Sequence, residues 1–166
     1  MSSSTPYRVL FVCLGNICRS PAAEIVCRAA LAEAHLQDSV AVDSCGTASY
    51  HVGSKPDARM LAALQRAGYA YLGHRARALS RSDGDRFDLI VPQDDDNYSD
   101  ILDTLGRQFS ARVVPMSYWF PPEAADCYKS VPDPYYGTDD DFDDVVALLR
   151  ASMPALIDFI RQARLA

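Results

Sequence analysis

The sequence has no long hydrophobic run and no excess of basic residues. Its apolar segments fall short of the roughly 18 uninterrupted residues that a membrane-spanning helix needs, and the polar start MSSSTPYR lacks the apolar core of a signal peptide. We therefore expect a cytoplasmic protein without membrane insertion. The net charge of −6 argues against nucleic acid as a partner, because binding to a phosphate backbone requires a basic face.

The cysteines form neither a disulfide framework nor a zinc motif. There are five of them, an odd number, and no two have the C-x-x-C spacing of a zinc site. The nucleotide-binding pattern G-x-x-x-x-G-K-[ST] is also absent. We expect free thiols, at least one of them reactive, and neither a metal nor a cofactor. Any phosphate that this protein handles must be bound at a local site.

Short apolar runs alternate with helical patterns along the whole chain. The runs predict strands over 7–12, 39–47, 87–93 and 111–116, and the other patterns predict helices over 20–36, 56–67, 97–105 and 142–164. This alternation predicts one three-layer α/β domain over 1–166, with a four-stranded parallel sheet and helices on both faces. We expect 1–6 to be flexible and 117–138, with four prolines, to be a loop.

The stretch VLFVCLGNICRSPAAE, residues 9–24, combines features of a phosphate-binding loop after the first strand. Cys13 ends the strand, where ligands bind in a parallel sheet, and a loop with Gly15 leads to a helix start at Ser20. A helix start and a curled loop present N–H groups to a phosphate dianion, and Arg19 adds a planar pair of donors. This positive field would favour the thiolate of Cys13, which could then attack phosphorus. In the alternative interpretation, Cys13 is a small core residue and Arg19 a surface charge.

Two motifs together identify a family resemblance. VCLGNICRSP and VPDPYYG, the latter at 131–137, resemble the low-molecular-weight protein tyrosine phosphatases. The similarity continues through DSCGT (43–47), GSKPDAR (53–59), GHRARAL (73–79) and DDDNYSDI (94–101). The resemblance implies a four-stranded parallel sheet, and metal-independent hydrolysis of phosphotyrosine monoesters through a cysteinyl-phosphate intermediate.

The resemblance also implies the catalytic roles. Cys13 would be the nucleophile, and Arg19 would hold the phosphate through its transition state. Asp133 would protonate the leaving phenolate and then activate water as a base, although an Asp before Pro134 is also ordinary turn chemistry. Ser20 would donate a hydrogen bond to the Cys13 thiolate, and it can also serve as a helix cap.

Other residues would support or line the site. Asn16 would fix the loop through Ser44 and His74. The backbone N–H groups that complete the cradle would come from Leu14, Gly15, Asn16, Ile17, Cys18 and Arg19. Tyr50, Tyr135 and Tyr136 would contact the substrate ring at the mouth of the pocket. His51 departs from the usual pattern of the family at this rim.

Several residues receive other interpretations. In the family, the cysteine matching Cys18 protects the oxidised nucleophile as a disulfide, so we expect redox sensitivity. Cys27, Cys45 and Cys127 are interpreted as packing residues. The acidic runs 94–96 and 139–144 are interpreted as solvated helix starts.

Alternative functions remain at this point. An arsenate reductase of the same fold needs further cysteines, and Cys127 is the only one beyond position 45. A protein-arginine phosphatase tends to have threonine in place of Ile17, and a catalytically dead phosphotyrosine-binding module would lack the nucleophile or the acid. The expected partners are phosphotyrosine proteins. Because Tyr135 and Tyr136 match positions implicated in phosphorylation and self-association, a cognate tyrosine kinase and a monomer or weakly associating state are also expected.

Overall fold

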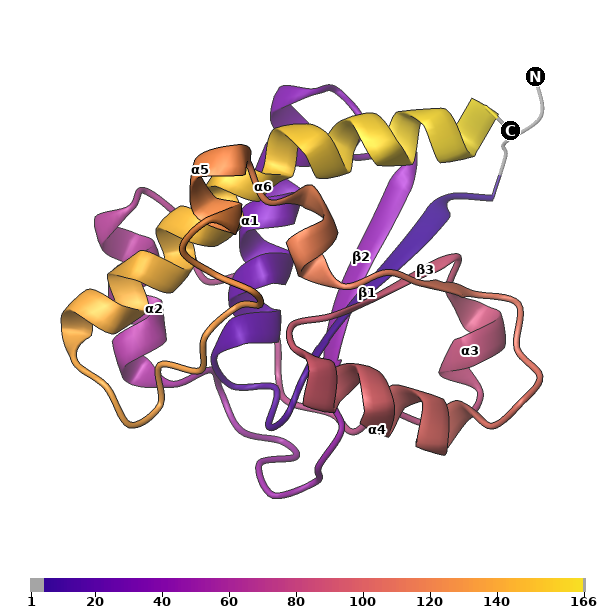
Figure 1. Cartoon of the computed structure of the whole chain (residues 1–166), viewed down its shortest axis with the longest axis horizontal. Coiled ribbons are helices and arrows are strands. Elements are labelled where there is room, and N and C mark those ends of the chain that lie inside the picture. Colours follow the sequence, from indigo (N-terminus) through magenta and orange to yellow (C-terminus); the bar gives the residue numbers. More distant parts are fainter. Residues whose placement is uncertain (1–4, 166) are drawn as a thin grey trace.

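A parallel sheet forms the middle layer of the molecule (Figure 1). The structure is a computed structural model that describes residues 5–165. The strands are β1 (Tyr7–Cys13), β2 (Val40–Gly46), β3 (Leu89–Pro92) and β4 (Arg112–Val113). They lie in the order β2-β1-β3-β4, and every neighbouring pair is parallel. The predicted four-stranded parallel sheet is therefore confirmed.

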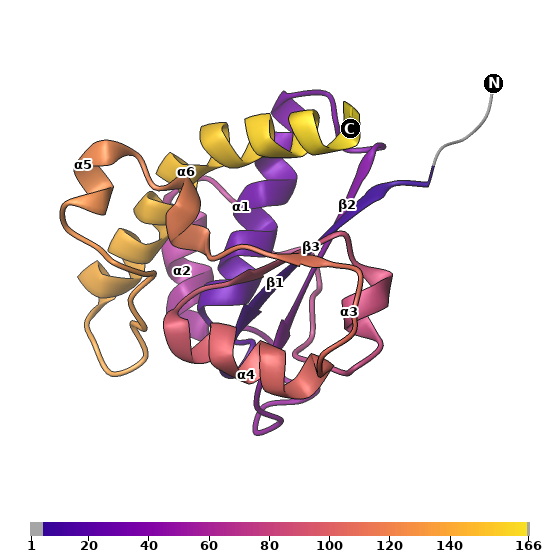
Figure 2. The same cartoon turned by 45° about the vertical axis from the view of Figure 1, so that its right-hand side comes forward.

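Helices cover both faces of this sheet, as Figures 1 and 2 show. On one side lie α1 (Arg19–Glu33), α2 (Ala58–Arg66) and α6 (Asp139–Leu165). On the other side lie α3 (Asp83–Arg86) and α4 (Asp95–Leu105). A 3-10 helix, η1 (Met116–Trp119), and the single turn α5 (Pro122–Ala125) lie in the segment between β4 and α6. The predicted three-layer α/β domain is confirmed.

Strand β1 is buried on both sides, since its alternating side chains enter a different hydrophobic cluster on each face of the sheet. Val9 and Phe11 belong to the larger hydrophobic cluster, under α1, α2 and α6. Leu10 and Val12 belong to the smaller cluster, which includes Ile101 of α4. Both clusters hold the strand that ends at Cys13, so the core fixes the position of this residue.

The order in which the chain adds strands to the sheet reverses beside β1. From β1 the chain passes through α1 to β2 on one side, and it then crosses to β3 on the other side. In such sheets a crevice opens beyond the carboxyl ends of the strands at this point, and ligands bind there. Cys13 therefore lies where a ligand is expected.

The boundaries of several elements differ from the prediction. The fourth strand covers only two residues of the predicted 111–116, because Pro115 has no N–H group to continue the ladder. The first helix ends at Glu33 and not at 36, and His35 has a left-handed φ of 58°. The segment 117–138 is not entirely a loop, since it contains most of η1 and all of α5. The short helix α3 was not predicted from the sequence.

The last helix begins at Asp139, three residues before the predicted start at 142. Its first turn is acidic, which is favourable at the positive end of a helix dipole. Of the predicted flexible segment 1–6, residues 1–4 lie outside the described residues, and Thr5 and Pro6 belong to no helix or strand. Within residues 5–165, none of the helices combines the length and the apolar character that crossing a membrane requires.

Candidate active site

The loop between β1 and α1 is held in place through its carbonyl groups. Its carbonyl oxygens accept hydrogen bonds from other segments at 2.8–2.9 Å. The pairs are Thr47 N to Cys13 O, Ala48 N to Leu14 O, and Asp57 N to Ile17 O. Among the described residues, the amides of Gly15, Asn16, Ile17 and Cys18 donate no backbone hydrogen bond. Because the N–H and C=O groups of a trans peptide point in opposite directions, the Gly15 and Cys18 amides point away from the segments that bind the Leu14 and Ile17 carbonyl oxygens, and they remain available for an anion.

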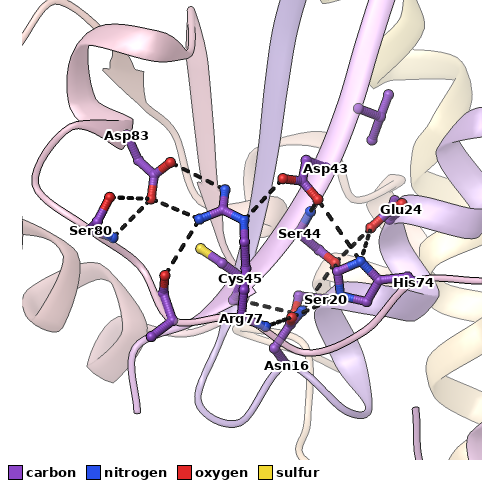
Figure 3. Close-up of polar contacts among 12 residues, drawn as sticks. Asn16, Ser20, Glu24, Asp43, Ser44, Cys45, His74, Arg77, Ser80 and Asp83 are labelled. Atoms are coloured by element: carbon purple, nitrogen blue, oxygen red, sulfur yellow. Dashed lines mark hydrogen bonds and ion pairs between the residues drawn. The ribbon is translucent and has the colours of Figure 1, made fainter. Parts of the chain in front are cut away.

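Asn16 holds the loop in this shape through hydrogen bonds of its side chain (Figure 3). The residue is fully buried and has a left-handed φ of 58°, a conformation that asparagine tolerates better than most residues. Its side-chain Nδ2 donates to Ser20 Oγ at 2.8 Å and to Ser44 Oγ at 3.0 Å. Its Oδ1 lies 3.0 Å from the Arg77 amide nitrogen and 2.8 Å from His74 Nε2. The structure thus brings together Asn16, Ser44 and His74.

Close approach of β2 also constrains the loop. A Cβ atom on Gly46 would lie 2.7 Å from the carbonyl oxygen of Leu14. Real Cβ atoms essentially never approach a backbone oxygen so closely, so this position requires glycine. The end of β2 and the loop are therefore packed backbone against backbone.

Ser20 contacts the nucleophile candidate directly. The distance from Cys13 Sγ to Ser20 Oγ is 3.0 Å, and both residues are buried. Since Ser20 Oγ accepts the Asn16 hydrogen bond, its own hydrogen is available for the sulfur or for the Cys45 carbonyl oxygen at 3.2 Å. Ser20 is not the helix cap, which corrects one interpretation of the sequence: the N-cap position of α1 is Cys18, without a side-chain hydrogen bond.

Arg19 is buried and held by partners distant in sequence. Its Nη1 donates to Asp94 Oδ2 at 2.6 Å and to the Val131 carbonyl oxygen at 3.2 Å. Burial opposes its charge, but the charge of Cys13 and the hydrogen bond to Asp94 outweigh this effect and raise the pKa of Arg19. The guanidinium is therefore a fixed cation beside Cys13.

Asp94 has two functions in the structure. Its Oδ1 accepts from the Asn97 amide at 2.8 Å, so it caps α4 as part of a capping box. Its Oδ2 binds Arg19 at 2.6 Å. The interpretation of 94–96 as a solvated helix start is correct for the cap, but it missed the contact that orients Arg19.

Asp133 faces Arg19 from the segment before α6. Its Oδ2 lies 3.7 Å from Arg19 Nη2, and its side chain is 44% exposed. Its Oδ1 accepts a hydrogen bond from the Tyr135 amide at 3.1 Å. The carboxyl group therefore combines turn chemistry with a position at the mouth of the site.

Cys13, Arg19 and Asp133 line a cavity of about 350 Å³. The lining consists of Cys13, Leu14, Gly15, Ile17, Cys18, Arg19, Tyr50, His51, Asp133, Tyr135 and Tyr136. All three predicted rim tyrosines are among them, together with His51. Asn16 and Ser20 are fully buried and do not line the cavity, so they support the loop and offer no side-chain contact to a ligand.

His74 lies beside two carboxylates (Figure 3). His74 Nδ1 lies 3.3 Å from Glu24 Oε1 and 3.9 Å from Asp43 Oδ1. Three potential ligand atoms of these residues lie within 4.8 Å of one another. Both carboxylates already have cationic partners, however: Glu24 pairs with Arg28 at 3.1 Å, and Asp43 pairs with Arg77 at 3.1 Å. The cluster therefore fits a role in holding His74 better than a role in binding a cation.

The other cysteines differ in their surroundings. Burial raises the pKa of Cys18, and the negative charge of Asp57 acts in the same direction. Cys27 and Cys45 are fully buried in the two hydrophobic clusters, so their interpretation as packing residues is correct. Cys127 is exposed, and the packing prediction for it is wrong.

Comparison with known proteins places this geometry in a family. A family model described as low molecular weight phosphotyrosine protein phosphatase matches residues 8–165. The chain is 43% identical to the protein of that name from Schizosaccharomyces pombe, over 82% of this chain and 86% of the relative. A crystal structure of a protein tyrosine phosphatase from Entamoeba histolytica is similar with a TM-score of 0.87 and 36% identity, over 95% of this chain and 99% of the other.

A further solved structure, an arginine phosphatase of Drosophila, is similar with a TM-score of 0.80 and 27% identity, over 92% of this chain and 96% of the other. The family match extends over nearly the whole described chain. It includes the loop with Cys13 and Arg19 and the segment with Asp133, which the fold brings to one cavity. The chain belongs to the low molecular weight phosphotyrosine protein phosphatase family.

Proposed function

We propose that this protein hydrolyses phosphotyrosine monoesters in proteins through a cysteinyl-phosphate intermediate on Cys13. The observation that carries the proposal is the cavity in which Cys13, Arg19 and Asp133 meet beside the loop amides of Gly15 and Cys18. These groups supply a nucleophile, a cationic clamp and a proton donor at one point. This set is sufficient for transfer of a phosphoryl group without a metal ion.

In the first step the thiolate of Cys13 attacks phosphorus while the bond to the tyrosine oxygen breaks. Asp133 gives its proton to the leaving phenolate oxygen, so tyrosine leaves as a neutral phenol. Arg19 and the loop amides hold the phosphate oxygens while negative charge is redistributed among them. Since Asp94 and Val131 fix the guanidinium, the clamp needs little reorganisation during the step.

In the second step a water molecule attacks phosphorus and the sulfur–phosphorus bond breaks. The carboxylate of Asp133 accepts a proton from this water, which restores the acid form. Cys13 leaves as a thiolate, and the Ser20 hydroxyl at 3.0 Å can donate a hydrogen bond to it. The products are inorganic phosphate and the free enzyme.

The rim of the cavity supports a preference for aromatic esters. Tyr50 and Tyr136 are 77% and 95% exposed, so their rings are available to stack on a substrate ring. The second candidate is a phosphoarginine substrate, which the similarity to the Drosophila arginine phosphatase favours. Against it, Ile17 lines the cavity at the position where a protein-arginine phosphatase tends to have threonine. Isoleucine is bulkier than threonine, and it suits a flat aromatic ring better than a guanidinium.

The test compares phosphate release from two peptides of the same sequence, one with phosphotyrosine and the other with phosphoarginine. We expect faster release from phosphotyrosine, in the presence of excess chelator, and no turnover by Cys13→Ser. That variant should still bind a phosphate analogue, since Arg19 and the loop amides remain. Loss of wild-type activity on chelation, or full activity of Cys13→Ser, would overturn the mechanism. Preference for phosphoarginine would favour the second candidate.

The chemistry of the thiols supports further parts of the proposal. All five cysteines are free, which suits the reducing cytoplasm. Cys18 lies in the same loop as Cys13, so we also propose that it captures the oxidised nucleophile in a reversible disulfide.

Tyrosine kinases that make the substrates are the proposed partners. The protein is proposed to act as a monomer or in weak self-association through the exposed Tyr136.

A further inference from the structure

The start of α2 lies between the phosphate-binding loop and the segment that carries Asp133. Asp57, the N-cap residue of α2, donates its backbone N–H to the Ile17 carbonyl oxygen at 2.8 Å. Its carboxylate accepts hydrogen bonds from Arg59 Nε at 3.1 Å and from Arg59 Nη2 at 2.9 Å. The position of the Arg59 guanidinium is thus fixed relative to the loop.

The same guanidinium contacts the opposite side of the site. Its central carbon lies 5.3 Å from the centre of the Tyr135 ring and 4.6 Å from the centre of the Phe142 ring. Both distances are within the range of cation–π attraction. Phe142 is fully buried in the first turns of α6, so it provides a rigid surface for this contact. Arg59 therefore connects the phosphate-binding loop with the segment of Asp133.

Tyr135 contacts both Arg59 and the acid, Asp133. Its backbone N–H donates to Asp133 Oδ1 at 3.1 Å, while Oδ2 is the oxygen that faces Arg19. The direction of the carboxyl group therefore depends on where the backbone of Tyr135 lies. Proton transfer is sensitive to such placement, because donor and acceptor must approach within about 2.6–3.2 Å. A shift of about 1 Å can reduce a rate by about 100-fold.

We propose that Arg59 is a positioning residue for the general acid, coupling the place of Asp133 to the phosphate-binding loop through Asp57 and Tyr135. The inference rests on the proposed function, because it assumes that Asp133 protonates the leaving group. Arg59 does not line the cavity and has no contact with the reacting atoms. Its loss should therefore affect leaving-group protonation and leave phosphate binding intact.

The helix α2 offers a matched control. Arg66, in its last turn, pairs with Asp143 of α6 at 2.7 Å. The side chains of Arg59 and Arg66 are 40% and 46% exposed, and each forms one ion pair with an aspartate. Arg66→Met thus removes a comparable charge and a comparable contact, but away from the acid.

The experiment measures kcat/KM for phenyl phosphate, which needs protonation of its leaving group, and for p-nitrophenyl phosphate, which needs little. Arg59→Met should lower the first by about 10-fold and the second by less than about 2-fold. The inhibition constant of inorganic phosphate should change by less than about 2-fold, since Arg19 and the loop amides are untouched. Arg66→Met should change all three quantities by less than about 2-fold. Equal losses on both esters, or no loss, would overturn the proposal.

Combination with Asp133→Asn separates this inference from the proposed function. If Arg59 acts through the acid, Arg59→Met should lose its selective effect on phenyl phosphate in the Asp133→Asn background. Selectivity that persists there would contradict the proposal. If Asp133→Asn alone affects both esters equally, the assignment of the acid fails and the role of Arg59 fails with it.

A conservative variant covers the case in which Arg59→Met does not fold, as judged by its circular dichroism and Tm. Arg59→Lys keeps a cation near the two rings but cannot form the two-pronged contact with Asp57. It should lose about 3-fold on phenyl phosphate and nothing measurable on p-nitrophenyl phosphate. Equal effects of the lysine variant on both esters would overturn the proposal.

Discussion

Two aspartates of this site each make two different contacts, one with each carboxylate oxygen. Asp133 binds the amide of Tyr135 through one oxygen and faces Arg19 with the other. Asp94 caps a helix with one oxygen and holds Arg19 with the other. Because each carboxylate has two oxygens, one can fix the side chain while the second serves the site. Substitutions at these positions therefore need a readout that distinguishes the two functions.

Asp133→Asn should affect the two chemical steps differently from a structural substitution. A phenolate with the pKa of tyrosine, about 10, leaves poorly without a proton, and general acids contribute about 10²–10⁴ in rate. The variant keeps an oxygen for the Tyr135 amide but has no acidic proton. Single-turnover kinetics should show a much larger loss in formation of the intermediate from a tyrosine-like ester than from a nitrophenyl ester, together with slower hydrolysis of the intermediate. Equal losses in the first step would indicate a loop anchor instead, with Asp126 and Asp139 as the next candidates for the acid.

Cys18→Ser tests the redox part of the proposal. Burial raises the pKa of the Cys18 thiol, so this residue should remain protonated and should not compete with Cys13 in catalysis. We expect the variant to keep kcat/KM within about 2-fold. After exposure to peroxide and then to added thiol, it should recover less activity than the wild type, because its sulfenic acid at Cys13 has no neighbouring thiol to trap it. Recovery equal to that of the wild type would disprove the disulfide.

At the scale of elements, the sequence predicted the first strand, loop and helix better than the distant contacts. The unit from Tyr7 to Glu33 is local, and its apolar run, glycine and helix start are adjacent in the sequence. The contact between Arg19 and Asp94 joins residues 75 positions apart, and only the packing of α4 beside the loop creates it. Asp94 could have been suspected from its place two residues after the end of β3, where a parallel sheet presents side chains to ligands. No local pattern marks Arg59, since its partners Tyr135 and Phe142 come from another segment.

Short elements were missed for a related reason. The helix α3 has only four residues and no apolar periodicity, and it is held by the buried side chain of Asp83. This carboxylate accepts from Arg77 Nη1 at 3.0 Å and from the Ser80 amide at 2.8 Å. Figure 3 shows the Arg77 guanidinium between Asp83 and Asp43. The ion pair therefore connects α3 with the Arg77 backbone, whose N–H binds Asn16 of the loop.

Asp83→Ala should destabilise the protein through this connection. Removing one partner of a buried ion pair leaves an uncompensated charge, and the usual cost is about 3–5 kcal/mol. Because the Arg77 side chain is 31% exposed and also binds Asp43, we expect a smaller loss, about 2 kcal/mol, in the free energy of unfolding by urea. Asp85→Ala, on the same short helix, removes only a hydrogen bond to the Ser110 amide and should cost about 1 kcal/mol or less. Arg77→Met should cost less stability in the Asp83→Ala background than in the wild type, because the ion pair between the two residues is already lost there, and equal costs in the two backgrounds would contradict this account.

At the scale of the whole molecule, the phosphate site and the acid are held in different ways. The loop with Cys13 follows a strand buried between two hydrophobic clusters, and Asn16 and Ser44 fix it from inside. Asp133 belongs to an irregular segment and is half-exposed. A rigid phosphate cradle and a less constrained proton donor suit the two steps, because the acid must serve a bulky phenolate first and a small water second.

The buried thiols on both faces of the sheet make the stability of the whole fold sensitive to alkali. Burial raises the pKa of Cys27 to about 12, and the charge of Glu24 adds to the effect against the opposing charge of Arg28. A group whose pKa is raised on folding stabilises the protein fully below its unfolded pKa, and this contribution is lost as the pH rises toward the folded pKa. For a thiol the loss therefore begins at about pH 8.5.

Urea unfolding in the presence of a reductant, at about pH 7.5 and about pH 9.5, tests this linkage. Between these conditions the unfolded chain ionises Cys27 while the folded protein keeps it protonated, which costs about 1 kcal/mol for this thiol. Cys27→Ala should be less stable than the wild type at the lower pH, because it loses packing in α1, but its further loss at the higher pH should be smaller by about 1 kcal/mol. Cys127→Ala is the matched control, since it removes an exposed cysteine, and its pH dependence should equal that of the wild type. Equal losses on alkalinisation for Cys27→Ala and the wild type would show that burial of this thiol does not link folding to pH.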